Sequence, residues 1–463
     1  MVFSSFVFLL LFLPITLGLY YLAPKKAKNG ILFLASLVFY AWGEPVYILI
    51  MLFSTVFDYC NGLALEKLEK KNNDKGRRAV LVLSLVVNLG LLCFFKYTDF
   101  MIKTMDDILG LNLPVMNIAL PIGISFYTFQ TLSYTIDVYR KQVKAQHNIV
   151  DFGMYICMFP QLIAGPIVRY ADVEHQLKIN ERIINPDRAF SGVLRFSLGL
   201  AKKVLIANQS GALFSEISSN GSVSSAVAWL GTFAFAIQIY FDFSGYSDMA
   251  IGLAKMLGFD LMENFDYPYM SKSITEFWRR WHISLGTWFR EYVYIPLGGN
   301  RRGLPRQILN LFIVWFLTGL WHGAGWNFVL WGLYFFVLLV VEKLFLLKWL
   351  EKLPSFVSHI YAMLAVLFSW AIFAVDDFTM LRGFIASMFG ANGVYSTDFL
   401  YYIKSYAVVL VLGVAFSTNY PKKLFKKLTN SNAIKFAVGA ILLALSVLML
   451  IGDSYNPFLY FRF

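Results

Sequence analysis

The chain has 463 residues, of which 58% are hydrophobic and 15% are charged. Soluble domains carry about 25% charged residues, so this composition excludes an ordinary soluble protein. The net charge of +12 would suggest nucleic acid binding in a soluble protein. Here the basic residues fall in loops between apolar runs, where the preference for positive cytoplasmic loops accounts for them. We therefore expect no nucleic acid partner.

Long apolar runs recur from one end of the chain to the other. In chain order they are Phe3–Leu22, Gly30–Tyr40, Ala79–Phe95, Ala226–Tyr240, Ile308–Leu320, Phe328–Val341, Ile360–Phe373, Tyr406–Phe416 and Ala433–Ile451. Several are shorter than the roughly 20 residues of a straight membrane span, so we expect tilted or broken helices. The pattern predicts an all-α polytopic integral membrane protein with roughly ten to twelve embedded helices in a single domain, residues 1–463.

The basic residues also predict an orientation in the membrane. They concentrate between residues 25 and 28, in Glu66–Arg78, and between residues 422 and 427. The positive-inside rule places these loops in the cytoplasm. Both termini would then lie outside the cytoplasm, with residues 1–22 kept as a first span because no charged segment or small-residue cleavage site marks them as a signal peptide.

Three segments carry polar residues within apolar surroundings: Leu120–Arg140, Phe159–Tyr170 and Gln238–Asp248. Pro160 and Pro166 argue against a continuous helix in the second of them. Irregular backbone at membrane depth is tolerated where it is buried in protein or lines a cavity. These polar groups either line a tunnel or bond helices together, and spacing alone favours neither.

Residues Ser273–Tyr292 have the pattern of an amphipathic interfacial helix. Ser273 and Glu276 form a capping box, which predicts that the helix begins there. A stripe rich in tryptophan faces one side, and Arg279, Arg280 and Arg290 face the other. The arginines, together with the basic loop Gly298–Gly303, could hold the phosphates of an anionic substrate.

Two histidines are the candidate chemical residues. His282 falls at the flank of this apolar stripe, neither fully exposed nor fully buried, and is either an interfacial hydrogen-bonding group or part of a reaction site. His322 ends a long apolar helix, between Gly319 and Gly323. It is either structural, within a helix-packing motif, or a general base that takes a proton from a hydroxyl or phenol.

Other residues give weaker signals. His147, His175 and His359 lie in or beside polar segments, and we assign them no role. The three cysteines are far apart and form no CxxC pair, which excludes a disulfide framework. In the absence of a His/Cys/carboxylate cluster, we predict no metal site and no permanently bound cofactor.

The last residues, 456–463, contain four aromatic rings and one arginine. Such a tail is too apolar to remain free, and we expect it to dock on the protein or at the membrane interface. It is either an aromatic belt or a segment that presents Tyr460 as an acyl carrier. A phenol has a pKa near 10, so it loses its proton far more easily than a sugar hydroxyl.

Several segments together resemble the membrane-bound O-acyltransferase (MBOAT) family, in its bacterial AlgI-like alginate O-acetyltransferase branch, with DltB-like D-alanyl transfer proteins more distant. The segments that carry the resemblance are Leu120–Arg140, Phe159–Tyr170, Gln238–Asp248, Glu263–Tyr269, Phe277–Arg301, Trp321–Asn327 and Phe458–Phe463. The resemblance implies a ring of tilted and broken helices around a thinned central tunnel. It also implies that His322 is the catalytic histidine, that His282 is a second functional residue, and that Tyr460 relays the acyl group.

The predicted function is transmembrane acyl transfer in a bacterial cytoplasmic membrane. Acetyl-CoA is the expected donor, bound near Arg279, Arg280 and Arg290, and Tyr460 is the expected acceptor. An extracytoplasmic esterase-like partner would then pass the acetyl group to a polysaccharide. One alternative is D-alanyl transfer to teichoic acid. The alternative from another class is a transporter or flippase, since broken helices and buried polar residues suit a transporter as well as an acyltransferase.

Overall fold

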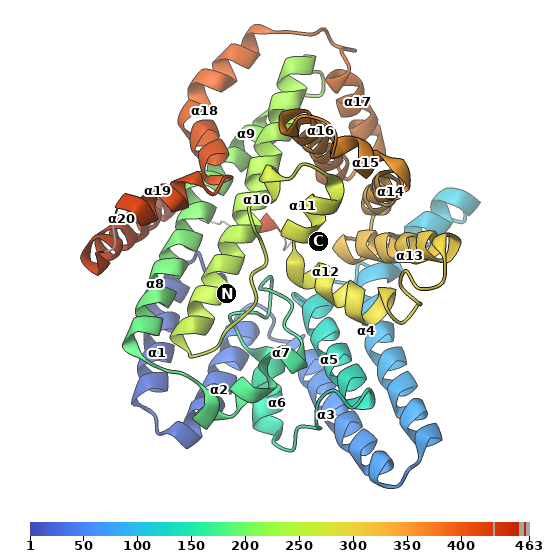
Figure 1. The fold of residues 1–463 in the computed structure, drawn as a ribbon, viewed down its shortest axis with the longest axis vertical. Helices are drawn as coiled ribbons and strands as arrows, with labels where there is room; N and C mark the ends of the chain where they lie inside the picture. Colours follow the sequence, from blue (N-terminus) through green and yellow to red (C-terminus); the bar gives the residue numbers. More distant parts are fainter. Residues whose placement is uncertain (429–430, 453–457, 460–463) are drawn as a thin grey trace. The chain divides into compact units, whose positions relative to one another are not determined.

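A computed structural model describes residues 1–428, 431–452 and 458–459 (Figure 1). These residues are helical apart from their connecting loops and one isolated β-bridge, between Phe265 and Trp281. Eight of the described helices are long and apolar enough to cross a membrane, and Val7–Leu22 adds a shorter apolar one. The predicted all-α polytopic membrane class is confirmed. The larger count of ten to twelve included shorter runs such as Gly30–Tyr40, which lies in a helix of 14 residues.

The chain forms two compact units. One contains Met1–Phe196 and Met249–Met262, and the other contains Ser197–Asp248 and Glu263–Phe463. Two of the three boundaries fall inside helices α8 (Pro186–Ala201) and α10 (Ser225–Met256), and the third lies between Met262 and Glu263, outside the helices. The assignment of residues 1–463 to a single membrane domain stays a prediction.

The first unit is a set of helices joined by short loops. Its elements are η1 (Val7–Phe12), α1 (Leu13–Leu22), η2 (Lys25–Ala27), α2 (Lys28–Ala41), α3 (Ile48–Lys70), α4 (Asp74–Leu109), α5 (Ile124–Tyr139), α6 (Ile149–Cys157), α7 (Tyr170–Leu177) and η3 (Ile179–Glu181). Helices α3, α4 and α5 pack on one another. The carboxylate of Asp58 joins them, because it accepts hydrogen bonds from Ser84 of α4 at 2.6 Å and Thr135 of α5 at 3.3 Å.

The segment with two prolines is irregular, as the sequence predicts. It connects α6 to α7 through turns and bends, and its residues 158–168 are all buried. Pro160 and Pro166 lack the backbone N–H that a helix would require there. Protein side chains therefore surround this non-helical backbone, as an apolar membrane interior requires.

The second unit carries all the candidate site residues that the structure describes. It includes the end of α8 and the first part of α10. Its other elements are η4 (Lys202–Ala207), α9 (Asn208–Ser219), η5 (Pro268–Met270), α11 (Ile274–Arg280), α12 (Ile283–Phe289), η6 (Arg290–Tyr294), α13 (Leu304–His322), α14 (Trp326–Val341), η7 (Glu342–Leu346), α15 (Leu347–Leu350), α16 (Ser355–Ala374), α17 (Phe378–Met388), α18 (Thr397–Phe416), α19 (Tyr420–Leu428) and α20 (Asn432–Ile451).

Helix α10 is the most enclosed of the eight candidate spans. In its most apolar window 78% of the residues are buried, whereas the other seven spans reach at most 44%. A helix that is apolar on all sides and largely buried belongs to a protein core. Within Gln238–Asp248, residues 239–247 are all buried, and Gln238 and Asp248 are partly exposed.

Two glycines bring α13 and α14 into close contact. A β-carbon added at Gly319 would overlap the carbonyl oxygen of Phe328, and one added at Gly332 would overlap the carbonyl oxygen of Trp315. The two helices pack along this line (Figure 1). The predicted role of Gly319 in close helix packing is confirmed, and this contact fixes the helix that ends in His322.

We expect Gly319→Ala to destabilise the protein by about 1–3 kcal/mol, because the methyl group meets a backbone oxygen that cannot rotate away. The apparent melting temperature of the purified protein in detergent measures the loss. Gly90→Ala in α4 is the matched control, since a β-carbon there meets nothing within 4 Å. A melting temperature that is equal in the two variants would contradict the packing argument.

Candidate active site

The segment predicted as one interfacial helix is broken at His282. Helix α11 ends at Arg280, and α12 begins at Ile283. His282 has φ 46° and ψ 53°, a left-handed conformation that costs a non-glycine residue on the order of 1–3 kcal/mol. The prediction of a continuous helix over Ser273–Tyr292 was therefore wrong, although its start at Ser273 is confirmed.

Tertiary hydrogen bonds account for the break. The N–H of Asp266 donates to the carbonyl of Arg280 at 2.9 Å, and the N–H of Ile283 donates to the carbonyl of Asn264 at 3.0 Å. The chain from Asn264 to Asp266 thus pairs with the backbone on either side of His282. These bonds replace helical ones and come from a distant segment, so side-chain periodicity could not reveal them.

His282 is buried, with 1% of its surface exposed. The ring of Phe243 from α10 packs edge-on against the imidazole at 4.7 Å between centroids, and the ring of Trp321 lies at 5.8 Å. The predicted half-exposed position at the flank of an apolar stripe was wrong, because it assumed an unbroken helix. The left-handed turn directs the side chain into the protein.

One amide oxygen sets the tautomer of His282. Asn264 Oδ1 accepts from the backbone N–H of Ser284 at 3.1 Å and from the Ser284 hydroxyl at 2.9 Å, and it lies 3.1 Å from His282 Nδ1. A backbone N–H can only donate, so the atom it faces must be the amide oxygen. Nδ1 must therefore carry the proton, which leaves Nε2 as the basic nitrogen of the neutral ring.

Burial also favours the neutral ring. It lowers the pKa of His282 from 6.5 to about 3, because the charged imidazolium would lose its hydration. The residue lies outside the eight candidate spans. At physiological pH it is therefore an uncharged group with one fixed donor and one fixed acceptor.

His322 is the last residue of α13 and is 3% exposed. Aromatic rings surround it: Trp331 at 4.9 Å, Trp321 at 5.1 Å and Phe373 at 5.5 Å between centroids. Trp321 contacts both histidine rings. The structure thus brings the two predicted histidines into one aromatic cluster.

Asn327 at the start of α14 holds part of this cluster in place. Its side-chain amide donates to Asp376 Oδ1 at 3.2 Å and to the carbonyl of Phe373 at 3.5 Å. The bonded carbonyl belongs to the residue whose ring packs on His322. Asn327 is 1% exposed, so these partners replace the water that its amide loses.

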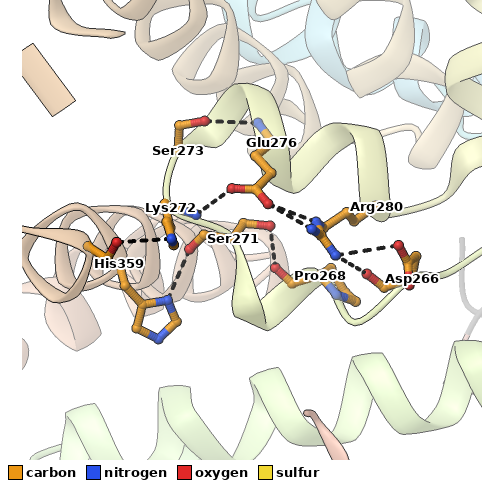
Figure 2. Close-up of polar contacts among 9 residues, drawn as sticks. Asp266, Pro268, Ser271, Lys272, Ser273, Glu276, Arg280 and His359 are labelled. Atoms are coloured by element: carbon orange, nitrogen blue, oxygen red, sulfur yellow. Dashed lines mark hydrogen bonds and ion pairs between the residues drawn. The ribbon is translucent and has the colours of Figure 1, made fainter. Parts of the chain in front are cut away.

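The polar face of α11 is held by a chain of ion pairs and hydrogen bonds (Figure 2). Ser273 Oγ accepts from the N–H of Glu276 at 3.0 Å, which is the predicted cap. Glu276 pairs with Arg280 at 2.9 Å, and Arg280 also reaches Asp266 at 3.4 Å. These contacts tie α11 to the segment that carries Asn264.

The three predicted phosphate-binding arginines therefore differ in their surroundings. Arg280 is committed to Glu276 and Asp266. Arg279 is exposed. Arg290 is also exposed and pairs with its neighbour Glu291 at 2.7 Å. Exposed guanidinium groups can reach an anion. The pair of Arg290 with Glu291 lies near the surface, where an ion pair is worth little and can be exchanged.

A buried carboxylate completes the support of α11. Glu342 of η7 is fully buried and accepts the backbone N–H groups of Ile274 at 2.6 Å and Thr275 at 2.8 Å. Its negative charge lies at the positive end of the helix. No role was predicted for Glu342, although an acidic residue directly after a long apolar run was a signal in the sequence.

Two further site features remain. Tyr460 lies outside the residues that the structure describes, whereas Phe458, two residues earlier, is 1% exposed and packs on Tyr246 of α10 at 4.4 Å. Within the described ranges, no three His, Cys, Asp or Glu side chains gather as a possible metal site.

These features define a polytopic membrane protein with two buried histidines in one aromatic cluster. The chain belongs to the membrane-bound O-acyltransferase family, whose model matches residues 138–382. It is therefore an O-acyltransferase with several membrane spans.

Two acetyltransferase relatives match the whole chain, and a D-alanyltransferase matches about half of it. A probable alginate O-acetylase AlgI of Azotobacter vinelandii is 39% identical over 100% of both chains. A peptidoglycan O-acetyltransferase of Helicobacter pylori is 31% identical over 100% of this chain and 98% of its own. A teichoic acid D-alanyltransferase of Bacillus subtilis is 29% identical over 52% of this chain and 64% of its own. The D-alanyl transfer protein is thus the more distant relative.

The buried His282 should make stability depend on pH. Its lowered pKa means that the unfolded chain binds a proton near pH 6.5 while the folded protein does not. The stabilisation is complete above pH 6.5 and falls as the pH drops toward 3, by about 1.4 kcal/mol per unit. Between pH 7 and 5 we expect the wild type to lose about 2 kcal/mol more than His282→Gln.

Thermal unfolding in detergent at pH 5, 6 and 7 measures this difference. His175→Gln is the control, because that histidine is exposed on α7 and its removal should leave the pH dependence unchanged. Equal pH dependence in the wild type and His282→Gln would contradict a neutral, buried His282.

Proposed function

We propose that this enzyme transfers an acetyl group from cytoplasmic acetyl-CoA to Tyr460, for O-acetylation of a cell-surface or secreted polysaccharide. The observation that carries the proposal is the pair of buried imidazoles in one aromatic cluster, His322 and His282. Full-length similarity to an alginate O-acetylase and a peptidoglycan O-acetyltransferase supports acetyl as the group and a polysaccharide as the final acceptor.

In the proposed reaction His322 is the general base. The Tyr460 oxygen attacks the thioester carbonyl, and His322 takes the phenolic proton as the new C–O bond forms. The C–S bond then breaks, and the CoA sulfur leaves with the proton that His322 returns. The products are an acetyl ester of tyrosine and free CoA thiol, so the step needs no metal and no oxidant.

His282 has a supporting role in this proposal. Its Nδ1 proton is held by Asn264, so its Nε2 can only accept a hydrogen bond while the ring is neutral. A fixed acceptor in the cluster can orient a hydroxyl group or a water molecule, and the neutral ring adds no positive charge to the site. The left-handed backbone at His282 is strain of the kind that concentrates at functional sites.

The proposed topology follows the basic loops. Cytoplasmic loops at residues 25–28, Glu66–Arg78 and 422–427 place both termini outside a bacterial cytoplasmic membrane. In this topology residues 456–463 would begin on the extracytoplasmic side of the membrane, where a secreted polymer is found. An extracytoplasmic esterase-like partner would accept the acetyl group from Tyr460 and pass it to the polysaccharide.

The two alternatives have less support. D-alanyl transfer to teichoic acid rests on a relative that matches half of the chain. A transporter would need a passage for the intact substrate, whereas the rings around His322 leave 3% of its surface exposed.

The deciding experiment uses purified full-length protein in proteoliposomes with labelled acetyl-CoA. Acyl transfer predicts a labelled ester on the peptide that contains Tyr460, release of free CoA, and no ester in Tyr460→Phe. Transport predicts intact acetyl-CoA in the opposite compartment. Labelled D-alanyl thioester in place of acetyl-CoA tests the other acyl group.

We expect His322→Ala to slow formation of the Tyr460 ester on the order of 10²–10⁴-fold, the usual contribution of a positioned general base. Half-saturation by acetyl-CoA should change little, since His322 acts on the acceptor. His175→Ala is the control for loss of a histidine. Full ester formation by His322→Ala would remove the proposed base.

Arg279→Gln and Arg290→Gln should raise the half-saturating acetyl-CoA concentration roughly tenfold if these exposed arginines bind phosphate. The effect should shrink at high salt, because exposed charges are screened. Arg382→Gln, an exposed arginine on α17, is the matched control. Steady-state kinetics at low and high ionic strength measure the half-saturating acetyl-CoA concentration. If it is unchanged in both variants, Arg279 and Arg290 do not bind the phosphates.

A further inference from the structure

We infer that Lys203, Asp242 and Tyr246 form an anchor that holds Phe458 and Leu459, and that they act as positioning residues for Tyr460, the next residue in the chain. The inference rests on the proposed function, in which Tyr460 accepts the acetyl group. It adds the residues that position this acceptor for reaction.

The anchor is built on a buried ion pair. Lys203 Nζ of η4 lies 2.6 Å from Asp242 Oδ1 of α10, and the two side chains are 5% and 3% exposed. Gly245 allows this approach, since a β-carbon there would lie 2.8 Å from the carbonyl oxygen of Gly199. Buried ion pairs cost several kcal/mol of desolvation per ion, so they need further partners to be stable.

The tail supplies one such partner. The backbone N–H of Leu459 donates to Asp242 Oδ2 at 2.7 Å. One carboxylate oxygen therefore binds the lysine, and the other binds the chain terminus. A hydrogen bond to a charged acceptor is stronger than one between neutral groups, which suits an attachment point.

The ring of Phe458 supplies a second partner for the ion pair. Lys203 Nζ lies 4.9 Å from its centroid, within the range of a cation–π contact. The ring of Tyr246, one turn after Asp242 on α10, meets it edge-on at 4.4 Å. Phe458 is 1% exposed as a result. Charge, hydrogen bond and ring packing thus all act on two consecutive tail residues.

The anchor lies beside the histidine cluster. Asp242, which binds the tail, is followed directly by Phe243, whose ring packs on His282 at 4.7 Å. Leu459 packs against the same hydrophobic cluster that contains Trp331 and Phe373, the rings around His322. The anchor therefore holds Leu459, the residue before Tyr460, against the cluster whose rings pack on His322.

A neighbouring ion pair provides a matched control. Lys202 and Asp248 join the same two helices at the same distance of 2.6 Å, but their side chains are 29% and 17% exposed. Asp248 lies six residues beyond Asp242 on α10. Because the Asp248 pair is less buried, Asp248→Asn controls for loss of an acid between these two helices, and Phe458→Ala tests the tail contact with both ion pairs intact.

The test measures the rate of Tyr460 ester formation in full-length purified protein over a range of labelled acetyl-CoA concentrations. For Phe458→Ala we expect a maximal rate lower on the order of 10²-fold, the usual effect of misplacing a reacting group. Half-saturation by acetyl-CoA should stay unchanged, because the donor site is intact. Asp242→Asn should slow the reaction similarly, whereas Asp248→Asn should leave it near the wild-type rate.

Phe458→Ala keeps the test decisive even where Asp242→Asn fails to fold, since it alters only the chain end. A wild-type rate in Phe458→Ala overturns the anchor and leaves the proposed function standing. A lower apparent affinity for acetyl-CoA at an unchanged maximal rate also overturns it. Absence of an ester on Tyr460 in the wild type overturns the proposed function and the positioning role together.

Discussion

The hydrogen bonds to the side-chain oxygen of Asn264 are the interaction on which the geometry of the site depends. They bind Ser284 at the start of α12 and His282 at the break between α11 and α12. Backbone pairing of residues 264–266 with residues on both sides of the break keeps the left-handed turn in place. The tautomer, burial and direction of the imidazole all follow from this contact.

A second constraint comes from helix packing. Gly319 and Gly332 let α13 and α14 approach until backbone touches backbone, and this fixes the end of α13 where His322 lies. The rings of Trp321, Trp331 and Phe373 then pack around the imidazole.

The sequence predicted the class of fold, because hydropathy is a local signal. It also singled out His282 and His322 as candidates, because an ionisable group in hydrocarbon is costly. The helix start at Ser273, the irregular segment around Pro160 and the close approach at Gly319 are confirmed, since each rests on local sequence. The break at His282 was missed, since the segment that causes it pairs with α11 and α12 only in three dimensions.

Lys203 and Glu342 were missed for a different reason. Each lies next to an apolar run, where a charge is a signal, but its meaning depends on a partner: Asp242 for Lys203, and the first N–H groups of α11 for Glu342. No spacing in the sequence connects these pairs. The family resemblance pointed to Glu263–Tyr269 without a role for Asn264, and the contacts of the folded chain supplied that role.

The enclosure of His322 has a consequence for how the donor is used. An imidazole with 3% of its surface exposed has almost no contact with bulk solvent. Water is the commonest competitor for an activated thioester, and a base that cannot reach water cannot activate it. In the proposed reaction, with His322 as the base and acetyl-CoA as the donor, this enclosure would keep the donor intact while no tyrosine is in place, so that the cell would lose little donor to hydrolysis when polymer synthesis stops.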